Sequence, residues 1–250
     1  MDTAMIRTTL NDLLCSADVE RAMRERIDEL AALLPEIRPM FGFEQHNPHH
    51  DKTVWDHTVA VVANASTERV LRWTALLHDI GKPHCFSVDA QGIGHFYGHA
   101  SRSAVIAEEI LQRLQFDAAV RERIVLLVKN HDTPLPVDDK GTKRLINRLG
   151  IEAALQLVDI HRADTAGLHP DYAYRYAEFD EVQARIERIA AEPGRLSVKD
   201  LAIDGNDLVA MGLKGKQIGL TLQAALEAVM AETIPNEHAS LLDYVRSRVR

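Results

Sequence analysis

Histidine and aspartate residues gather in one part of this sequence in a pattern that could bind a divalent metal ion. The 250-residue chain contains 12 histidines. Its segment 76–104 reads LLHDIGKPHCFSVDAQGIGHFYGHASRSA and carries His78, Asp79, His95 and His99. Imidazole and carboxylate groups are ligands that zinc, iron, manganese, nickel and cobalt accept, and imidazole also exchanges protons near neutral pH. The residue types therefore indicate a metal site or a proton-transfer site.

Helical spacing predicts that several of these side chains point into the core. His57 lies three residues after Val54 and four before Val61, on the apolar face of its predicted helix. Similar spacings from neighbouring apolar residues place three more side chains on inward faces: His99, His131 and Asp164. Because an unpaired buried carboxylate is strongly disfavoured, inward-facing Asp79 and Asp164 need a compensating positive charge. A divalent cation supplies that charge.

The adjacent His78 and Asp79 can both reach one ion only if their helix ends at this point. Gly81 and Pro83 predict that end, because glycine suits a C-terminal cap and proline cannot continue a helix. Another His-Asp pair, 131–132, stands at the end of a second predicted helix. Two helix ends thus present the same pair of ligand types.

Each candidate also has an ordinary structural interpretation. A lone inward histidine such as His57 is more often a hydrogen-bonded core residue than a ligand. His50 and His95 lie in predicted loops, where solvated polar residues are common, and Lys82 and Arg102 are typical surface residues. These interpretations leave one coincidence unexplained, which favours a metal site. Several histidines and acids share inward or helix-end positions: His57, His78, Asp79, His99, His131, Asp132 and Asp164.

The remaining sequence supplies the elements that must position these side chains, and helical periodicity dominates it. Helices are predicted at 19–34, 54–65, 68–80, 99–114, 117–132, 142–149, 151–166 and 173–192. Residues 86–97 alternate apolar and polar positions around Asp-Ala-Gln-Gly, which predicts a short β-hairpin. We expect an all-α fold: a helical bundle with a short β-hairpin insertion and a small C-terminal helical appendage.

Three regions are predicted along the chain. Residues 1–44 form an N-terminal helix and a connector, 45–192 form the metal-binding helical domain, and 193–250 form a helical tail. The Pro-Gly pair within AEPGRLSVKD, residues 191–200, marks the second boundary.

Composition narrows the class of protein. The formal net charge is −8, which argues against a protein that wraps nucleic acid with a broad basic surface. Cys15 and Cys85 show no CxxC spacing, so neither a disulfide framework nor a thiolate zinc site is indicated. The sequence carries neither an export signal nor an apolar run of transmembrane length. We therefore expect a cytoplasmic protein without a membrane partner.

Several motifs resemble a known family. His57, the pair 78–79 and Asp164 match the H…HD…D pattern of the HD superfamily of metal-dependent phosphohydrolases, which has an all-helical fold. From about residue 45 onward the chain resembles the HD region and tail of bacterial CCA-adding tRNA nucleotidyltransferases. The motifs that carry this likeness are NPHHDKTVWDHT, LLHDIGKP, GHFYGHASRSAVIAEEILQRL, LVKNHD, KRLINRLG, RADTAG and DGNDLVAMGLKGKQIGLTLQAALEAV.

The sequence departs from these enzymes in one respect. Their nucleotidyltransferase head needs a Gly-Ser loop and a D-x-D carboxylate pair that hold magnesium on the nucleoside triphosphate, and this chain contains neither. The region 1–44, with one expected helix, is too short for a strand-containing catalytic head. We therefore expect no CCA addition by this chain.

The resemblance implies one or two divalent ions, with Mn, Fe, Ni, Co, Mg and Zn all compatible with the ligands. A first ion takes His57, His78, Asp79 and Asp164. A second ion takes His99, His131 and Asp132, with Asp79 bridging the two. Two ions about 3.5–4 Å apart share and acidify one water, which then attacks a phosphorus atom in line.

The resemblance also suggests roles for residues around the ions. Asp79 and Lys82 are expected to be catalytic, with the lysine neutralising a non-bridging phosphate oxygen, and His95 is expected to protonate the leaving oxygen. His161, one turn before Asp164, is a candidate either for supporting the ligands or for contacting substrate. The expected substrate contacts are His50, Arg102, Arg144 and His161.

Two functions remain open from the sequence. The first is a metal-dependent phosphatase or phosphodiesterase, including 2′,3′-cyclic phosphodiesterase activity, whose substrate is a phosphorylated small molecule, a nucleotide or an RNA end. The second is a non-catalytic, metal-stabilised module that binds tRNA or a nucleotide. Lys82 and the histidines of the second group favour the enzyme, and the net negative charge weakly disfavours a pure RNA-binding protein.

Overall fold

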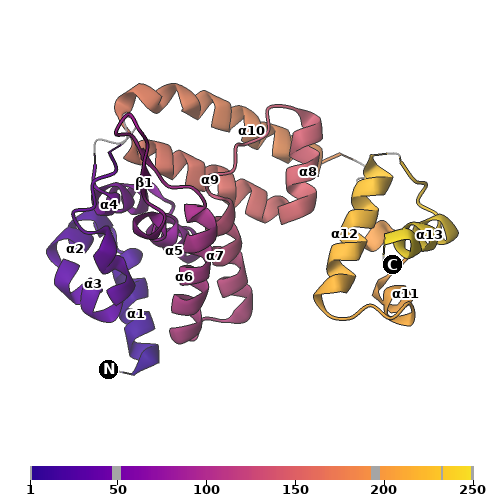
Figure 1. Cartoon of the computed structure of the whole chain (residues 1–250), viewed down its shortest axis with the longest axis horizontal. Helices are drawn as coiled ribbons and strands as arrows, with labels where there is room; N and C mark the ends of the chain where they lie inside the picture. Colours follow the sequence, from indigo (N-terminus) through magenta and orange to yellow (C-terminus); the bar gives the residue numbers. More distant parts are fainter. Residues whose placement is uncertain (1, 47–51, 193–197, 232, 249–250) are drawn as a thin grey trace. The chain divides into compact units, whose positions relative to one another are not determined.

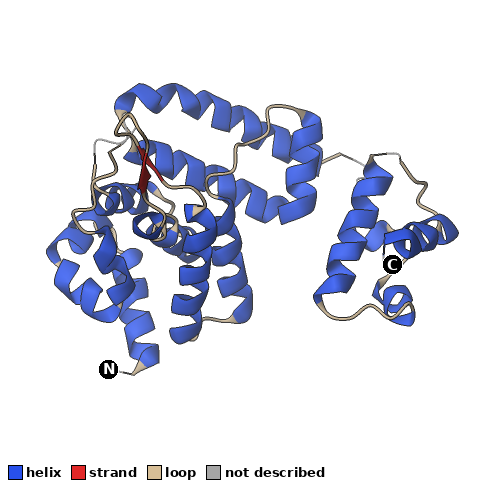
Figure 2. Cartoon of the chain, in the orientation of Figure 1, coloured by secondary structure: helices blue, strands red, loops and turns tan. Residues whose placement is uncertain are grey.

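The computed structural model describes residues 2–46, 52–192, 198–231 and 233–248. Helices dominate this part of the chain, and two short strands form the hairpin (Figure 2). The prediction of an all-α fold with a short hairpin is confirmed. No helix of the described residues is long and apolar enough to cross a membrane.

The chain divides into two compact units, coloured along the sequence in Figure 1. The first unit comprises residues 1–135 and 152–183, and the second comprises 136–151 and 184–250. The predicted boundaries at 44/45 and 192/193 do not coincide with this division. Within residues 1–135 of the first unit, the helices are α1 (Thr3–Leu14), α2 (Val19–Glu25), α3 (Ile27–Leu33), α4 (Val54–Asn64), α5 (Arg69–Leu77), α6 (His99–Arg113) and α7 (Ala118–Asn130).

The remaining helices complete the two units. They are α8 (Asp139–Leu149), α9 (Ile151–Gly167), α10 (Arg175–Ala190), α11 (Gly205–Ala210), α12 (Lys216–Met230) and α13 (His238–Arg248). The 3-10 turns are η1 (Pro35–Met40), η2 (Lys82–His84), η3 (Pro170–Tyr174) and η4 (Val198–Asp200). Helices α11 to α13 have an apolar core of their own, with Leu208, Leu226, Leu241 and Val245 among its buried residues.

The N-terminal region corrects one prediction. Residues 1–44 contain three helices, α1, α2 and α3, rather than a single helix with a connector. The predicted helix 19–34 is interrupted at Arg26, whose backbone (φ −108°, ψ 26°) leaves the helical region. Helix α1 is amphipathic: Leu10 and Leu14 of its apolar face are fully buried, and the Trp73 indole donates a hydrogen bond to Asn11. Since α1 packs on α5, this region belongs to the first unit.

Helix α5 ends where the His-Asp pair begins. Its last residue is Leu77, three residues earlier than the predicted end at 80, and His78 forms the cap. The following turn lies against the start of α6, where a Cβ on Gly81 would lie 2.6 Å from the Ser103 backbone nitrogen and 2.7 Å from the His99 carbonyl oxygen. The absence of a side chain at Gly81 therefore lets α6 approach this turn.

The hairpin is shorter than the alternating segment 86–97. Strands β1 (Ser87–Val88) and β2 (Gly94–His95) pair antiparallel, with Ser87 opposite His95 and Val88 opposite Gly94. Its turn is closed by Asp89, whose carboxylate accepts hydrogen bonds from the backbone of Gln91 and Ile93. The side chain of Asp89 therefore fixes the turn that carries His95.

We expect Gly81→Ala to lower the melting temperature of the protein. The new methyl group would collide with backbone atoms, so the start of α6 must shift, and overpacking of this kind costs about 1–3 kcal/mol. Thermal unfolding followed by circular dichroism measures the change.

Gly219→Ala provides the matched control. A Cβ at this position of α12 meets no atom within 4 Å, and alanine favours a helix by up to about 1 kcal/mol over glycine. If Gly81→Ala unfolds at the wild-type temperature, the close packing of α6 on the turn is wrong.

Candidate metal centre

Two histidines of the site lie at helix C-termini, where carbonyl groups lack partners within the helix. His78 caps α5, and its Nδ1 lies 2.7 Å from the Ala75 carbonyl oxygen. His131 caps α7, and its Nδ1 lies 2.8 Å from the Val128 carbonyl oxygen. In each case the imidazole contacts the carbonyl three residues earlier, so the helix end itself orients the ring.

The other two inward histidines are oriented in the same way. The Nδ1 atom of His99 lies 2.9 Å from the Phe96 carbonyl oxygen, and that of His57 lies 3.4 Å from the Gly167 carbonyl oxygen. A carbonyl can only accept, so the contacts of 2.7–2.9 Å place the hydrogen on Nδ1 in His78, His99 and His131. The Nε2 atom of each of these rings, when neutral, is then an acceptor, which is the arrangement found in metal-ligating histidines. His57 has its shorter contact through Nε2, which lies 3.0 Å from Asp164 Oδ1.

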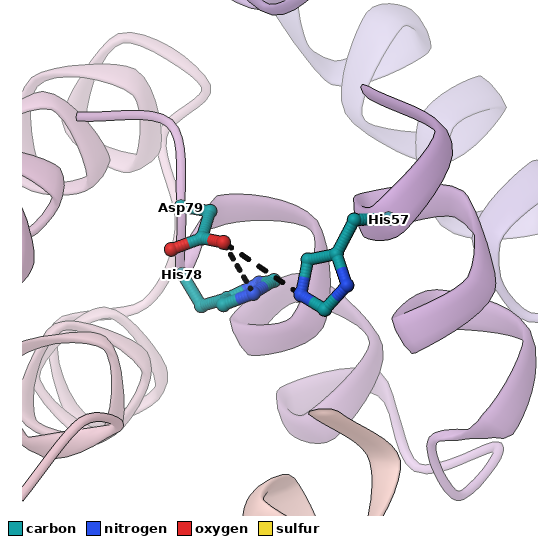
Figure 3. A group of neighbouring side chains, drawn as sticks. All are labelled: His57, His78 and Asp79. Atoms are coloured by element: carbon teal, nitrogen blue, oxygen red, sulfur yellow. Dashed lines mark ion pairs between the residues drawn. The ribbon is translucent and has the colours of Figure 1, made fainter. Parts of the chain in front are cut away.

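The first group of acceptors surrounds one oxygen of Asp79. Figure 3 shows the rings of His57 and His78 turned toward this carboxylate, with Nε2–Oδ2 distances of 3.7 and 3.2 Å. Asp164, on the last turns of α9, lies 3.0 Å from His57 Nε2 and 3.6 Å from His78 Nε2 through its Oδ1. Elements α4, α5 and α9 thus bring four candidate ligands together.

The second group surrounds the other oxygen of Asp79. Its Oδ1 lies 3.4 Å from His99 Nε2 and 3.6 Å from His131 Nε2. The two Nε2 atoms are 3.2 Å apart. With the hydrogen on Nδ1 in both neutral rings, the two Nε2 atoms point lone pairs at each other, and no hydrogen lies between them. Such an arrangement is favourable only when a proton or a cation lies between the acceptors.

The buried polar atoms of the site lack hydrogen-bond partners. Within the described chain, neither His78 Nε2 nor Asp79 Oδ1 makes a hydrogen bond of acceptable geometry. Both residues are almost fully buried, and an unsatisfied buried polar atom costs about 1–3 kcal/mol. A cation in the first group would satisfy His78 Nε2, and a cation in the second group would satisfy Asp79 Oδ1.

The distances also fit metal binding. Ligand atoms at about 2.0–2.2 Å from one ion are roughly 2.8–3.6 Å apart for bond angles near those of common coordination geometries. The separations within each group, from 3.0 to 3.7 Å, match that range. Asp79 belongs to both groups, as the sequence led us to expect of a bridging ligand.

The electrostatics of the site favour a positive charge. Burial alone favours the neutral imidazole of His78, but the nearby carboxylates of Asp79 and Asp164 outweigh it and raise the pKa of His78 to about 10. Burial likewise opposes ionisation of both carboxyl groups, yet their histidine neighbours hold the pKa of each well below the usual range. Without a bound cation, His78 therefore holds a proton at neutral pH beside two ionised carboxylates. A metal ion would supply the same positive charge and leave the His78 ring neutral, with its Nε2 as a ligand atom.

Lys82 is buried beside the metal ligands, which excludes the interpretation as a solvated surface residue. Its Nζ lies 2.7 Å from Asp79 Oδ2 and 2.8 Å from Gln45 Oε1. The ammonium group also stands over the ring of Phe96, 5.3 Å from its centroid. Lys82 thus contributes part of the positive charge that the buried carboxylates require.

A cavity of about 480 Å³ opens onto both groups. It is lined by residues of the first unit: Asp79, Lys82, Gly94, His95, Phe96, Tyr97, Gly98, His99, His131, Asp132, His161, Asp164 and Arg175. His95 is held on its wall by a 2.8 Å contact between its Nε2 and Asp89 Oδ2. The predicted acid His95 and the predicted metal ligands therefore share one cavity.

His161 lines the same cavity and is buried. Its Nε2 atom makes no hydrogen bond among the described residues. Burial lowers the pKa of His161 to about 4; the Asp164 charge opposes this change, while the His131 and Arg175 charges add to it. His161 is therefore neutral at pH 7, with a polar atom available to a molecule in the cavity.

Other predicted residues are not brought into the two ligand groups. Asp132 lines the cavity but is exposed and lies outside both groups. Arg102 is exposed on α6 and does not line the cavity, and Arg144 is exposed on α8 in the second unit. His50 lies outside the described residues. For both arginines the ordinary interpretation, a solvated helix face, agrees with their exposure.

Sequence reasoning missed three residues at the site. Gln45 binds Lys82, Tyr97 is on the cavity rim, and Arg175 begins α10 with its guanidinium 5.3 Å from the centroid of the Phe179 ring. Gln45 and Tyr97 lie in loops, where periodicity carries no information. Arg175 was within the predicted helix 173–192 but resembled any surface arginine.

Comparisons with known proteins agree with the resemblance seen in the sequence. The family model described as tRNA nucleotidyltransferase domain 2, putative, matches residues 88–245. An A-adding tRNA nucleotidyltransferase of Deinococcus radiodurans is 33% identical over 238 residues, which cover 89% of this chain and 53% of that protein. A CC-adding tRNA nucleotidyltransferase of Thermus thermophilus is 31% identical over 235 residues, with coverages of 89% and 52%. A multifunctional CCA protein of an Azoarcus species is 35% identical over 106 residues, covering 41% of this chain and 25% of that protein.

The chain spans about half the length of the first two relatives. The match to the family model runs from the hairpin into α13 and covers more than half of the chain, including the cavity residues His95, His99, His131 and Asp164. The predicted likeness to a region of the CCA-adding enzymes is confirmed. The chain therefore belongs to the tRNA nucleotidyltransferase domain 2 family.

Proposed function

We propose that this chain is a metal-dependent phosphohydrolase of the HD type that hydrolyses a phosphoester of a nucleotide or an RNA end. One observation carries the proposal: Asp79 Oδ1, His99 Nε2 and His131 Nε2 face one another at 3.2–3.6 Å, and all three are acceptors. The other oxygen of Asp79 belongs to a second set of acceptors. This arrangement suits two ions with Asp79 between them.

The proposed ligands differ in one respect from those expected from the sequence. The clusters of His57, His78 and Asp79 and of Asp79, His99 and His131 each hold one ion, and Asp164 joins the first through its contacts with His57 and His78. Asp132 is left out because it is exposed and forms no ion pair with a histidine among the described residues. Divalent ions in such a site acidify a water molecule and neutralise phosphoryl oxygens.

Residues around the ligands bind and orient the substrate in this proposal. Lys82 presents its ammonium group at the cavity wall, where it can meet a phosphate oxygen. Asp89 orients the His95 ring, which we assign as the group that donates a proton to the leaving oxygen. The unpartnered Nε2 of His161 and the guanidinium of Arg175 are available for further contacts with the substrate.

The family relationship favours one alternative, a module that binds tRNA or a nucleotide without hydrolysing it. The relatives are named for adding nucleotides to tRNA, and this chain matches about half of each of the first two. Binding of tRNA at physiological salt, with every phosphoester in a hydrolysis screen intact, would support that alternative.

Asp79→Asn is expected to lose both bound metal and hydrolysis. The amide removes the negative charge that both ion positions share, and the histidines cannot replace it. Metal content per chain and turnover of 2′,3′-cyclic nucleotides and a generic phosphodiester are measured together. Asp132→Asn, which changes an exposed carboxylate of the same cavity, is the control and should retain metal. Full metal occupancy in Asp79→Asn would exclude the bridging role of Asp79.

Lys82→Met is expected to retain metal but to lower turnover by about 10²–10³, the scale of one lost transition-state stabiliser. The substitution removes the ammonium group while preserving the unbranched chain. Lys129→Met, at an exposed position on α7, controls for the loss of a lysine. Wild-type turnover in Lys82→Met would exclude a catalytic role for this residue.

Chelation is expected to lower the melting temperature, because the buried acceptors then face one another without a cation. A ligand at a hundred times its dissociation constant stabilises a protein by about 2.7 kcal/mol, and its removal costs the same amount. Calorimetry before chelation, after chelation and after re-addition of metal measures this effect. Purified protein without metal, and with a melting temperature that no added ion changes, contradicts the proposed centre.

A further inference from the structure

An exposed tyrosine stands on the rim of the cavity. Tyr97 lines the cavity, yet 78% of its surface is accessible to solvent. Aromatic side chains usually bury a large apolar area in protein cores and interfaces. A ring left exposed beside a polar cavity is therefore a candidate for binding a flat molecule.

The structure holds this ring in a defined orientation. Tyr97 stacks on the imidazole of His95, with ring centroids 5.2 Å apart and ring planes at 9°. His95 is itself fixed by Asp89, which closes the hairpin turn. One face of Tyr97 is thus covered by His95, and its high exposure leaves the opposite face to solvent.

The exposed ring and the metal ligands belong to the same cavity. Tyr97 is two residues before His99, and Gly98 between them has a left-handed backbone with φ of 76°. Tyr97, Lys82 and residues of both ligand groups line this cavity, whose volume is in the range of small-molecule sites, about 300–1,000 Å³. A ligand that contacts both the tyrosine and the ligand groups needs a flat aromatic part and an anionic part.

The charges at the anionic end suit a phosphate. Lys82 is paired with Asp79, whereas Arg175 forms no ion pair among the described residues and stands over the ring of Phe179. A guanidinium group binds phosphate oxygens with two parallel hydrogen bonds. The lining of the cavity therefore combines an exposed aromatic face with cationic groups.

We propose that Tyr97 is the stacking platform for the base of a phosphorylated nucleoside whose phosphate lies at the metal centre. The inference rests on the proposed function for the position of the phosphate, and it adds the residue that recognises the base of the nucleotide or RNA end. Stacking is tolerant of base identity because every base has a flat face. Tyr97 therefore selects nucleotides as a class.

Equilibrium binding tests the proposal without using turnover. Calorimetry compares AMP with ribose 5-phosphate, which lacks the base, and the ligand is checked for hydrolysis after each titration. Tyr97→Ala is expected to weaken AMP binding about 5- to 150-fold, the range of one lost base–aromatic stack, and to leave ribose 5-phosphate binding unchanged. Tyr97→Phe keeps the ring and should bind AMP like the wild type.

Tyr174→Ala is the matched control, because Tyr174 is 64% exposed in the same unit and does not line the cavity. Its AMP affinity should equal that of the wild type. Wild-type affinity of Tyr97→Ala for AMP, or an equal loss for AMP and ribose 5-phosphate, overturns the stacking role. The stacking role is also overturned if the wild-type protein binds AMP no more tightly than ribose 5-phosphate. None of these results depends on metal-dependent hydrolysis, which the turnover assays test separately.

A second arm identifies the source of the nucleotide. The same variants are titrated with a short single-stranded oligonucleotide that ends in a 3′-phosphate. If Tyr97→Ala weakens binding of the oligonucleotide, the platform binds the base of an RNA end. If Tyr97→Ala weakens binding of AMP alone, the platform binds a free nucleotide. Absence of any Tyr97-dependent affinity for both ligands contradicts the proposal.

Discussion

The buried carboxylate of Asp79 is the constraint on which the arrangement of the site depends. Both of its oxygens face histidine Nε2 atoms, and the Lys82 ammonium group lies 2.7 Å from one of these oxygens. Asp79 and Asp164 together carry two negative charges, so the site requires more positive charge than the single ammonium group of Lys82 supplies. The helices around it are therefore organised about a position for cations, and the close approach of α6 at Gly81 serves the same arrangement.

The predicted inward direction of the candidate ligands agrees with the structure where helical periodicity determines direction. His57, His99, His131 and Asp164 were predicted to point inward because each has apolar neighbours at helical spacing, and the structure brings all four to Asp79 or its neighbours. The end of α5 followed from Gly81 and Pro83. These inferences needed only local geometry.

The failures have a different physical origin. Whether a cation such as Lys82 is buried depends on residues distant in sequence, here Gln45 and Phe96. Helix α1, by contrast, was within reach of periodicity, because Ile6, Leu10 and Leu13 recur at helical spacing. Arg102 shares a helix with His99, yet it faces solvent. Sharing an element with a ligand does not bring a residue to the site.

The hydrogen bonds from histidine Nδ1 to backbone carbonyls have one further consequence. In many metal proteins a carboxylate or another side chain orients the ligand, and mutation of that side chain disturbs the ion. Here the orienting groups of His78 and His131 are main-chain atoms of the last turns of α5 and α7. No substitution can delete those carbonyls, but fraying of either helix end would release its imidazole. In the proposed metal centre, ion affinity is therefore coupled to the local order of two helix termini.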